Sequence, residues 1–155
     1  MKKFYGLLTI AGLIVLLDRW TKRWIMAHFH VGDSQSVTSF FSLTYVRNTG
    51  TAFGLFQGRN DVLLTLAVII LAVLFYSARG ICERGGWLSF LGVALVIGGA
   101  IGNMIDRWRF DQVIDFLDFH FWPVFNVADS AISIGTAGIL IGLWLRDRRR
   151  AEPAQ

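Results

Sequence analysis

The sequence Gly98-Gly99-Ala100-Ile101-Gly102-Asn103-Met104-Ile105-Asp106-Arg107 ends one long apolar segment of this chain, and a second apolar segment begins after Phe125-Asn126-Val127-Ala128-Asp129. Within and between these two motifs, carboxylates and amides recur close to segments that could cross a bilayer. An ionisable group at membrane depth needs a partner, a water-filled cavity or a function. The stretch 98–132 therefore predicts both a membrane fold and a functional site.

The composition is that of a membrane protein. Hydrophobic residues make up 54% of the 155 residues, and the mean hydropathy is positive, which is unusual for a soluble domain. A bilayer core of about 30 Å requires about 20 apolar residues per helix. We predict one domain with membrane spans at about residues 4–26, 62–78, 87–105 and 126–145.

The first span could also be the apolar region of a secretory signal peptide, because Lys2 and Lys3 precede it. No small-residue cleavage site follows the apolar run, however, and the polar run Asp18-Arg19-Trp20-Thr21-Lys22-Arg23 stands there instead. We therefore predict a retained span. Asp18 and Lys22 are four residues apart, in the favourable order for an ion pair on one helix face. This pair either locks the helix end or takes part in the chemistry.

The charge distribution predicts the topology. The net charge is +4, but the basic residues stand mostly at the ends of the spans, so topology explains them better than nucleic-acid binding. The terminal basic clusters, at residues 2–3 and 146–150, favour cytoplasmic termini. Most carboxylates then fall at or beyond the outer face, where we expect the chemistry. The single Cys82 excludes an intramolecular disulfide, and His28 and His30 are read as interfacial residues instead of metal ligands.

Two segments outside the spans have their own character. Residues 31–57 contain only short apolar runs, and the run 36–46 is rich in β-branched and aromatic residues, which predicts a small extracytoplasmic β-cradle. Asn48-Thr49-Gly50 follows in a stretch of small residues that permits a tight turn, in which Asn48 could be purely structural. Residues 108–122 mix charged and aromatic side chains, which predicts an interfacial segment on the outer leaflet.

Paired carboxylates are the chemistry that these motifs favour. Two carboxylates held close together cannot both ionise easily, so one keeps a proton. Such a pair can accept a proton from water as the water attacks a carbonyl, and can donate a proton to the departing amine. We prefer Asp115 with Asp129, because Asp129 at membrane depth is the costlier residue. Asp115 with Asp118, three residues apart, is the alternative and would need no tertiary folding.

Five motifs, in order along nearly the whole chain, resemble those of the lipoprotein signal peptidases, the type II signal peptidases of bacteria. They are Asp18-Arg19-Trp20-Thr21-Lys22, Asn48-Thr49-Gly50-Thr51-Ala52-Phe53, the run 98–107 quoted above, Val113-Ile114-Asp115-Phe116, and Phe125-Asn126-Val127-Ala128-Asp129-Ser130. The resemblance implies an all-α membrane protein with four transmembrane helices, a small extracytoplasmic β-cradle and an interfacial helix. It implies an aspartic endopeptidase that removes the signal peptide of prolipoproteins just before the cysteine that carries a diacylglyceryl group.

The resemblance also implies roles for individual residues. Catalysis falls to Asp115 and Asp129, the pair already preferred on chemical grounds. Substrate positioning is implied for Asn48, Gly50, Asn103, Arg107 and Asn126, and a supporting role for Asp18, Lys22, Asp106, Gly98, Gly99, Gly102 and Ala128. We further expect the small side chains at Gly98, Gly99 and Gly102 to leave room for acyl chains.

The expected partners are a diacylglyceryl-prolipoprotein, membrane phospholipid and inhibitory globomycin-type cyclic peptides, with no nucleic acid, no cofactor and no metal. The expected location is the bacterial cytoplasmic (inner) membrane, with both termini cytoplasmic and the active site near the outer, periplasmic face.

Two other protein classes could use such residues. A small transporter or proton relay could place Asp18, Asp106, Asp115 and Asp129 near the membrane. It would predict carboxylates deep in the spans and an internal repeat, and the sequence has neither clearly. A membrane scaffold would explain the helices and their small residues but not the clustered Asn and Asp.

Overall fold

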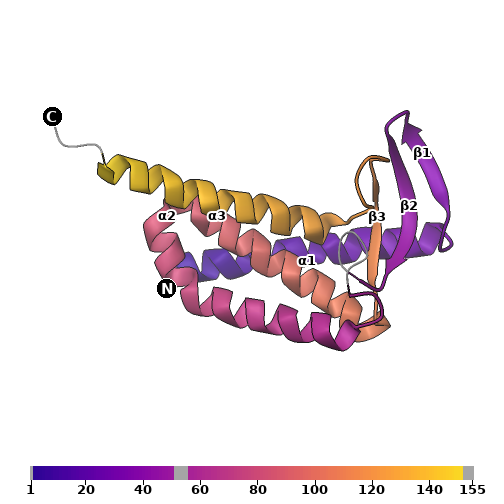
Figure 1. Cartoon of the computed structure of the whole chain (residues 1–155), viewed down its shortest axis with the longest axis horizontal. Coiled ribbons are helices and arrows are strands. Elements are labelled where there is room, and N and C mark those ends of the chain that lie inside the picture. The colour runs from indigo at the N-terminus through magenta and orange to yellow at the C-terminus, as the bar shows by residue number, and fades with distance from the viewer. Residues whose placement is uncertain (1, 51–55, 152–155) are drawn as a thin grey trace.

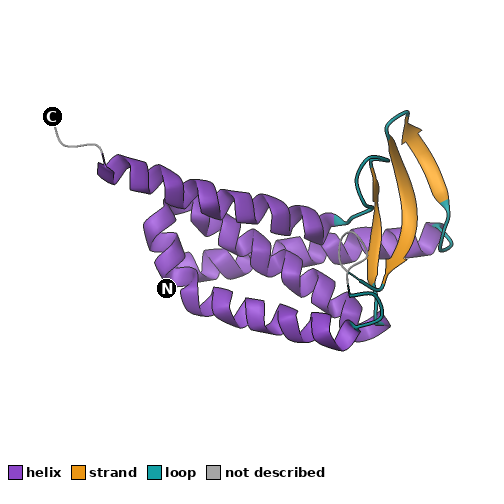
Figure 2. Ribbon diagram, in the orientation of Figure 1, coloured by secondary structure: helices purple, strands orange, loops and turns teal. Residues whose placement is uncertain are grey.

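The computed structural model describes residues 2–50 and 56–151. In chain order these residues form α1 (Lys2–His28), β1 (Ser34–Thr38), β2 (Phe41–Asn48), α2 (Asn60–Phe110), β3 (Val113–Asp118) and α3 (Val127–Ala151). The helices form an elongated bundle, and the sheet stands across one end of it (Figure 1, Figure 2). The beginning of α1 and the end of α3 lie at the opposite end of the bundle.

All three helices are long and apolar enough to cross a membrane, over Phe4–His28, Asn60–Phe110 and Val127–Arg149. Large apolar side chains cover their outer surfaces, including Leu16, Val73 and Ile134, each more than half exposed. Such a surface suits lipid, and a helix satisfies its own backbone hydrogen bonds there. The prediction of a mostly helical membrane fold with a small sheet is confirmed.

Helix α2 folds back on itself at Gly86, whose φ of 68° and ψ of −152° are not helical. Its two arms, residues 60–85 and 87–110, then run beside each other. The side chain of Asn60, at the start of α2, donates a hydrogen bond to the carbonyl of Arg107, near its end (3.1 Å). Leu71 on one arm and Ile97 on the other belong to the same buried cluster. The predicted spans 62–78 and 87–105 each fall within one arm.

Small residues let the other helices approach the second arm of α2. A Cβ atom at Gly98 would lie 2.7 Å from the carbonyl oxygen of Ala11 in α1. At Gly99 it would lie 2.4 Å from the carbonyl oxygen of Ala128 in α3. Both distances are too short for any residue larger than glycine, as is usual where helices pack closely in lipid. The expectation of acyl-chain space at Gly98, Gly99 and Gly102 is therefore wrong, because protein atoms fill the space beside all three.

The sheet has the strand order β1-β2-β3, and both pairs of strands are antiparallel. The first two strands come from the predicted β-cradle, of which residues 51–55 lie outside the described residues. The third strand lies within the predicted interfacial segment 108–122, and the interfacial helix that the resemblance implies is not found there. Only the first residues of the segment continue α2, and Val113–Asp118 pairs with β2, placing Asp115 opposite Val46.

The sheet is attached to the bundle through one buried cluster. Ile25 near the end of α1 packs with Tyr45 of β2 and with Ile114 and Phe116 of β3. Burying these side chains contributes about 1.5–3 kcal/mol each. The cluster therefore fixes β3, and with it Asp115, at the ends of the helices.

Candidate active site

The first turn of α3 is closed by Asn126 and Asp129. The backbone N–H of Asp129 donates to Oδ1 of Asn126 (2.9 Å), and the backbone N–H of Asn126 donates to Oδ2 of Asp129 (3.2 Å). This reciprocal arrangement is a capping box, which satisfies amides that a helix start leaves unpaired. A further N–H of this turn, that of Ala128, donates to Oδ1 of Asp18 in α1 (3.1 Å). Local helix chemistry thus fixes where the Asp129 carboxylate points.

Asp115 reaches the same place from β3. Its side chain is almost completely buried, at 2% exposed. Its Oδ2 accepts a hydrogen bond from Nδ2 of Asn48 (2.9 Å), and its Oδ1 accepts one from Nδ2 of Asn126 (2.7 Å). Burial, followed by the nearby Asp129 carboxylate, raises the pKa of Asp115 to about 7. Asp115 can therefore hold or release a proton near neutral pH.

Asn126 and Asn103 join the two aspartates into one hydrogen-bonded group. Nδ2 of Asn126 donates to Oδ1 of Asn103 (3.1 Å) as well as to Asp115. Nδ2 of Asn103 in turn donates to Oδ1 of Asp129 (2.8 Å). Residues from β3, α2 and α3 thus meet, and each oxygen of Asp115 and Asp129 accepts a hydrogen bond.

Asp118 belongs to a different environment. Its carboxylate accepts hydrogen bonds from the hydroxyl of Thr44 (2.8 Å) and from the backbone N–H of His120 (2.9 Å). Partial burial alone would raise the pKa of Asp118, but these hydrogen bonds outweigh it and the pKa is lowered. The structure therefore groups Asp115 with Asp129 and leaves Asp118 apart.

A buried ionic cluster adjoins this group. Nζ of Lys22 forms ion pairs with Oδ2 of Asp18 (2.9 Å) and Oδ2 of Asp106 (2.8 Å), and all three side chains are fully buried. The ion pair expected between Asp18 and Lys22 is therefore present. Gly102 makes room for it, because a Cβ atom there would lie 2.7 Å from the Asp18 carboxylate.

Arg19 is the member of this cluster that the sequence did not single out. It pairs with Asp106 across two helices, and its Nε lies 3.9 Å from the Asp18 carboxylate. The only sequence feature that could have identified Arg19 is its position next to Asp18, because no short sequence spacing relates Arg19 to Asp106.

Arg107 connects the site to the turn after β2. Its Nη2 donates to the carbonyl oxygen of Gly50 (2.6 Å), and the N–H of Gly50 donates to Oδ1 of Asn48 (2.9 Å). Nη1 of Arg107 is buried and has no hydrogen-bond partner among the described residues. A guanidinium N–H is thus left available in the site.

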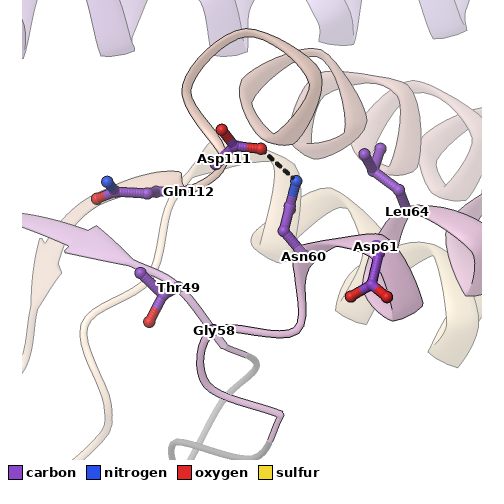
Figure 3. Close-up of a pocket in the computed structure, with 7 residues that line it drawn as sticks. All are labelled: Thr49, Gly58, Asn60, Asp61, Leu64, Asp111 and Gln112. Atoms are coloured by element: carbon purple, nitrogen blue, oxygen red, sulfur yellow. Dashed lines mark hydrogen bonds between the residues drawn. The ribbon is translucent and has the colours of Figure 1, made fainter.

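An open pocket of about 530 Å³ lies beside the site without including either aspartate. Figure 3 shows it, with the Asn60 side chain hydrogen-bonded to Asp111; its lining residues are Thr49, Gly58, Asn60, Asp61, Leu64, Asp111 and Gln112. Thr49 directly follows Asn48, so the pocket adjoins the aspartates at the turn after β2. Leu64 also lines an apolar groove between the two arms of α2, with Thr65, Val68, Ile69, Met104, Ile105 and Trp108. Within the described ranges, no cluster of three His, Cys, Asp or Glu side chains has the arrangement of a metal site.

Apolar helices that carry, at one end, a hydrogen-bonded pair of aspartates define a membrane protein with a two-carboxylate site, in which Asp115 is buried and Asp129 half-buried. Comparison with known proteins gives the family. The model of the family described as Signal peptidase (SPase) II matches residues 10–145, and the chain belongs to this family.

Individual relatives agree with the family assignment. A lipoprotein signal peptidase of Desulfitobacterium hafniense is 44% identical over 143 residues, which covers 91% of this chain and 94% of the relative. One of Halothermothrix orenii is 40% identical over 138 residues, covering 88% and 93%. A bacterial membrane enzyme solved by the in meso method at 2.3 Å superposes with a TM-score of 0.86 at 31% identity, covering 97% of this chain and 93% of that enzyme.

Proposed function

We propose that this protein is an aspartic endopeptidase that removes the signal peptide from diacylglyceryl-modified prolipoproteins, cleaving just before the lipidated cysteine. Family membership and relatives named lipoprotein signal peptidases support the activity. The observation that carries the mechanism is the position of Asn126, whose side-chain Nδ2 donates a hydrogen bond to the Asp115 carboxylate and whose backbone N–H donates one to the Asp129 carboxylate. Asp115 and Asp129 act as the catalytic pair.

In this mechanism the pair holds one proton and activates one water molecule. The ionised aspartate accepts a proton from the water as the oxygen attacks the scissile carbonyl, and the protonated aspartate stabilises the developing oxyanion. A proton then passes to the departing amine, the C–N bond breaks, and the pair returns to one proton. A pKa near 7 suits Asp115 to this exchange.

The amides and the guanidinium have different tasks in this proposal. The side chains of Asn48, Asn103 and Asn126 already bind the aspartates, so they orient the catalytic groups. Nη1 of Arg107 has no hydrogen-bond partner among the described residues, so it can donate to the substrate backbone. Fixed donors of this kind stabilise charge without reorganising during the reaction.

The protein crosses the bacterial inner membrane four times, with both termini cytoplasmic and the sheet at the periplasmic side. The two arms of α2 supply the second and third spans. The lipidated substrate stays in the membrane plane, and the site at the end of the bundle meets its cleavage site there. Phospholipid surrounds the apolar helices, and a globomycin-type cyclic peptide would inhibit by occupying the substrate position.

Cleavage of a purified diacylglyceryl-prolipoprotein in detergent, with a metal chelator present, tests the mechanism. We expect wild type to cleave, and Asp115→Asn and Asp129→Asn to lose at least about 1,000-fold of kcat because neither can exchange protons. Asp118→Asn is the matched control and should keep near-normal kcat.

Each other outcome has a defined meaning. An inactive Asp118→Asn with an active Asp115→Asn would replace the proposed pair by the adjacent one. Loss of wild-type activity on chelation would reject the metal-free mechanism. Failure of wild type to cleave any lipidated substrate would reject the function.

A further inference from the structure

We propose that Lys22 is a positioning residue for the aspartate pair. It fixes the orientation of the Asn103 amide that binds Asp129, and its charge sets the pH range in which the pair holds a single proton. The inference rests on the two-aspartate mechanism proposed above. It assigns Lys22 a task beyond joining α1 to α2.

Lys22 contacts the active-site amides as well as its ion-pair partners. Nζ of Lys22 forms ion pairs with Asp18 (2.9 Å) and Asp106 (2.8 Å), and it donates a hydrogen bond to Oδ1 of Asn103 (3.0 Å). The ammonium is fully buried. The ion pairs with Asp18 and Asp106 are sufficient to join the two helices, so the hydrogen bond to Asn103 indicates a second role for Lys22.

The contact with Asn103 determines what the amide presents to Asp129. Oδ1 of Asn103 accepts from Lys22 and from Asn126. A flipped amide would place an N–H₂ group against the ammonium, which has no acceptor. Nδ2 of Asn103 must therefore face Asp129, and a donor in this place favours the ionised carboxylate.

The charges around Lys22 balance when the aspartate pair holds one proton. The groups that surround Lys22 come from every element of the site: Asp18 and Arg19 from α1, Asp106 and Arg107 from α2, Asp115 from β3 and Asp129 from α3. With one shared proton, the three cations face three anions. Residues 51–55, which lie outside the described ranges, do not change this count, because none of their side chains is ionisable. Removing Lys22 leaves an excess negative charge, which favours a second proton on the pair.

Lys22→Met is the direct test, with kcat and KM measured across pH on a lipidated substrate. The side chain keeps its length and loses its charge. We expect kcat at neutral pH to fall at least about tenfold with KM within about twofold, because the pair and not the substrate site is disturbed. The acid limb of the kcat profile should move upward by about one pH unit, since loss of a nearby cation raises the affinity of a carboxylate for protons.

Two further variants separate charge from orientation. Arg19→Gln removes a cation of the same cluster that pairs with Asp106 and contacts neither Asn103 nor the two aspartates. It should leave kcat within about twofold and move the acid limb clearly less than Lys22→Met does. Asp18→Asn/Lys22→Gln restores the charge balance, so kcat should stay low while the acid limb returns to its wild-type pH. This double variant also tests the inference if Lys22→Met does not fold.

A double-mutant cycle tests the route through Asn103. If Lys22 acts through that amide, Lys22→Met/Asn103→Ala should be no slower than Asn103→Ala alone. Additive losses would overturn the inference, as would an unmoved acid limb in Lys22→Met or an equal shift in Arg19→Gln.

A readout without turnover separates this inference from the proposed mechanism. Infrared titration of the intact protein without substrate follows the carboxylic-acid band that Asp115→Asn removes. In Lys22→Met this band should persist to a higher pH by about one unit. If Asp115→Asn cleaves normally, the two-aspartate mechanism fails whatever the band does. If the band does not move in Lys22→Met, the role of Lys22 fails even though the mechanism stands.

Discussion

Asn126 uses one side chain for two purposes. Its Oδ1 caps α3 by accepting the N–H of Asp129, and its Nδ2 binds Asp115 and Asn103. Because the backbone N–H can only donate, the cap decides which end of the amide faces Asp115. The same hydrogen bonds that begin the helix thus orient the carboxylates of the proposed catalytic pair.

Replacing Asn126 by Asp tests this double use. Asp caps helices about as well as Asn, so α3 should form normally. The variant places a carboxylate where Asp115 and Asn103 now receive a donor, and kcat/KM should fall by about 100-fold or more. Circular dichroism should be unchanged. Activity near that of wild type would show that the Asn126 donor is dispensable.

The raised pKa of Asp115 has a consequence for stability. A group whose pKa rises from 3.8 to about 7 on folding contributes stability that is fully present below pH 3.8 and is lost as pH rises through 7. Asparagine resembles the protonated acid at every pH. Asp115→Asn should therefore raise the apparent Tm by several degrees at pH 8 and change it little at about pH 3.5, below both pKa values. An equal effect at both pH values would contradict an ionised Asp115 at pH 8.

At the scale of elements, the contact between α2 and α3 places Asp129 beside Asn103. A methyl group at Gly99 would clash with the backbone of Ala128 and push the first turn of α3 away. Gly99→Ala should cost about 1–3 kcal/mol of stability. It should also lower kcat, because a small displacement of a reacting group greatly slows a reaction. Gly12→Ala in α1 is the matched control, because no atom lies within 4 Å of its added Cβ. If both variants behave alike, close packing at Gly99 does not position the site.

Elements defined by local pattern were predictable from the sequence. Hydropathy placed the first span at residues 4–26, where the apolar helix is Phe4–His28, and β-branched residues placed β1 and β2. β3 was missed because the alternation around Asp115 is short, and its partner β2 lies before α2 in the chain. The aromatic, charged segment 108–122 gave no sign of a strand, and Val113–Asp118 within it forms one by pairing with β2.

In the site, too, contacts within one segment were predictable from the sequence, and contacts between distant segments were not. The spacing of Asp18 and Lys22 predicted their ion pair, and the cost of Asp129 at membrane depth favoured its grouping with Asp115. The contacts of Lys22 with Asp106 and Asn103 join different helices, so no local spacing reveals them. The glycines were recognised as packing residues, but only the structure shows that the neighbouring helices leave no acyl-chain space there.

At the scale of the whole molecule, the two ends of the bundle differ in chemistry. The sheet and both aspartates lie at one end. At the other, Arg146 of α3 donates to the backbone of Glu83, close to the fold-back at Gly86. Basic residues concentrate there, including Arg79, Arg148 and Arg149. Positive residues near short loops tend to stay in the cytoplasm, which favours a periplasmic sheet.

Cysteine labelling tests this topology, because Cys82 is the single cysteine of the chain. In a Cys82→Ser background, Ser36→Cys places a thiol on the exposed strand β1. Glu83→Cys places one near the fold-back, where the Glu83 side chain is 65% exposed, and it keeps every basic residue. A membrane-impermeant maleimide should label Ser36→Cys in intact spheroplasts, and should label Glu83→Cys only after permeabilisation. The reverse pattern would invert the protein and move the aspartates to the cytoplasmic face. Labelling of both thiols in intact spheroplasts would mean that the two arms of α2 do not cross the membrane as separate spans, because the fold-back would then share the outer face with the sheet.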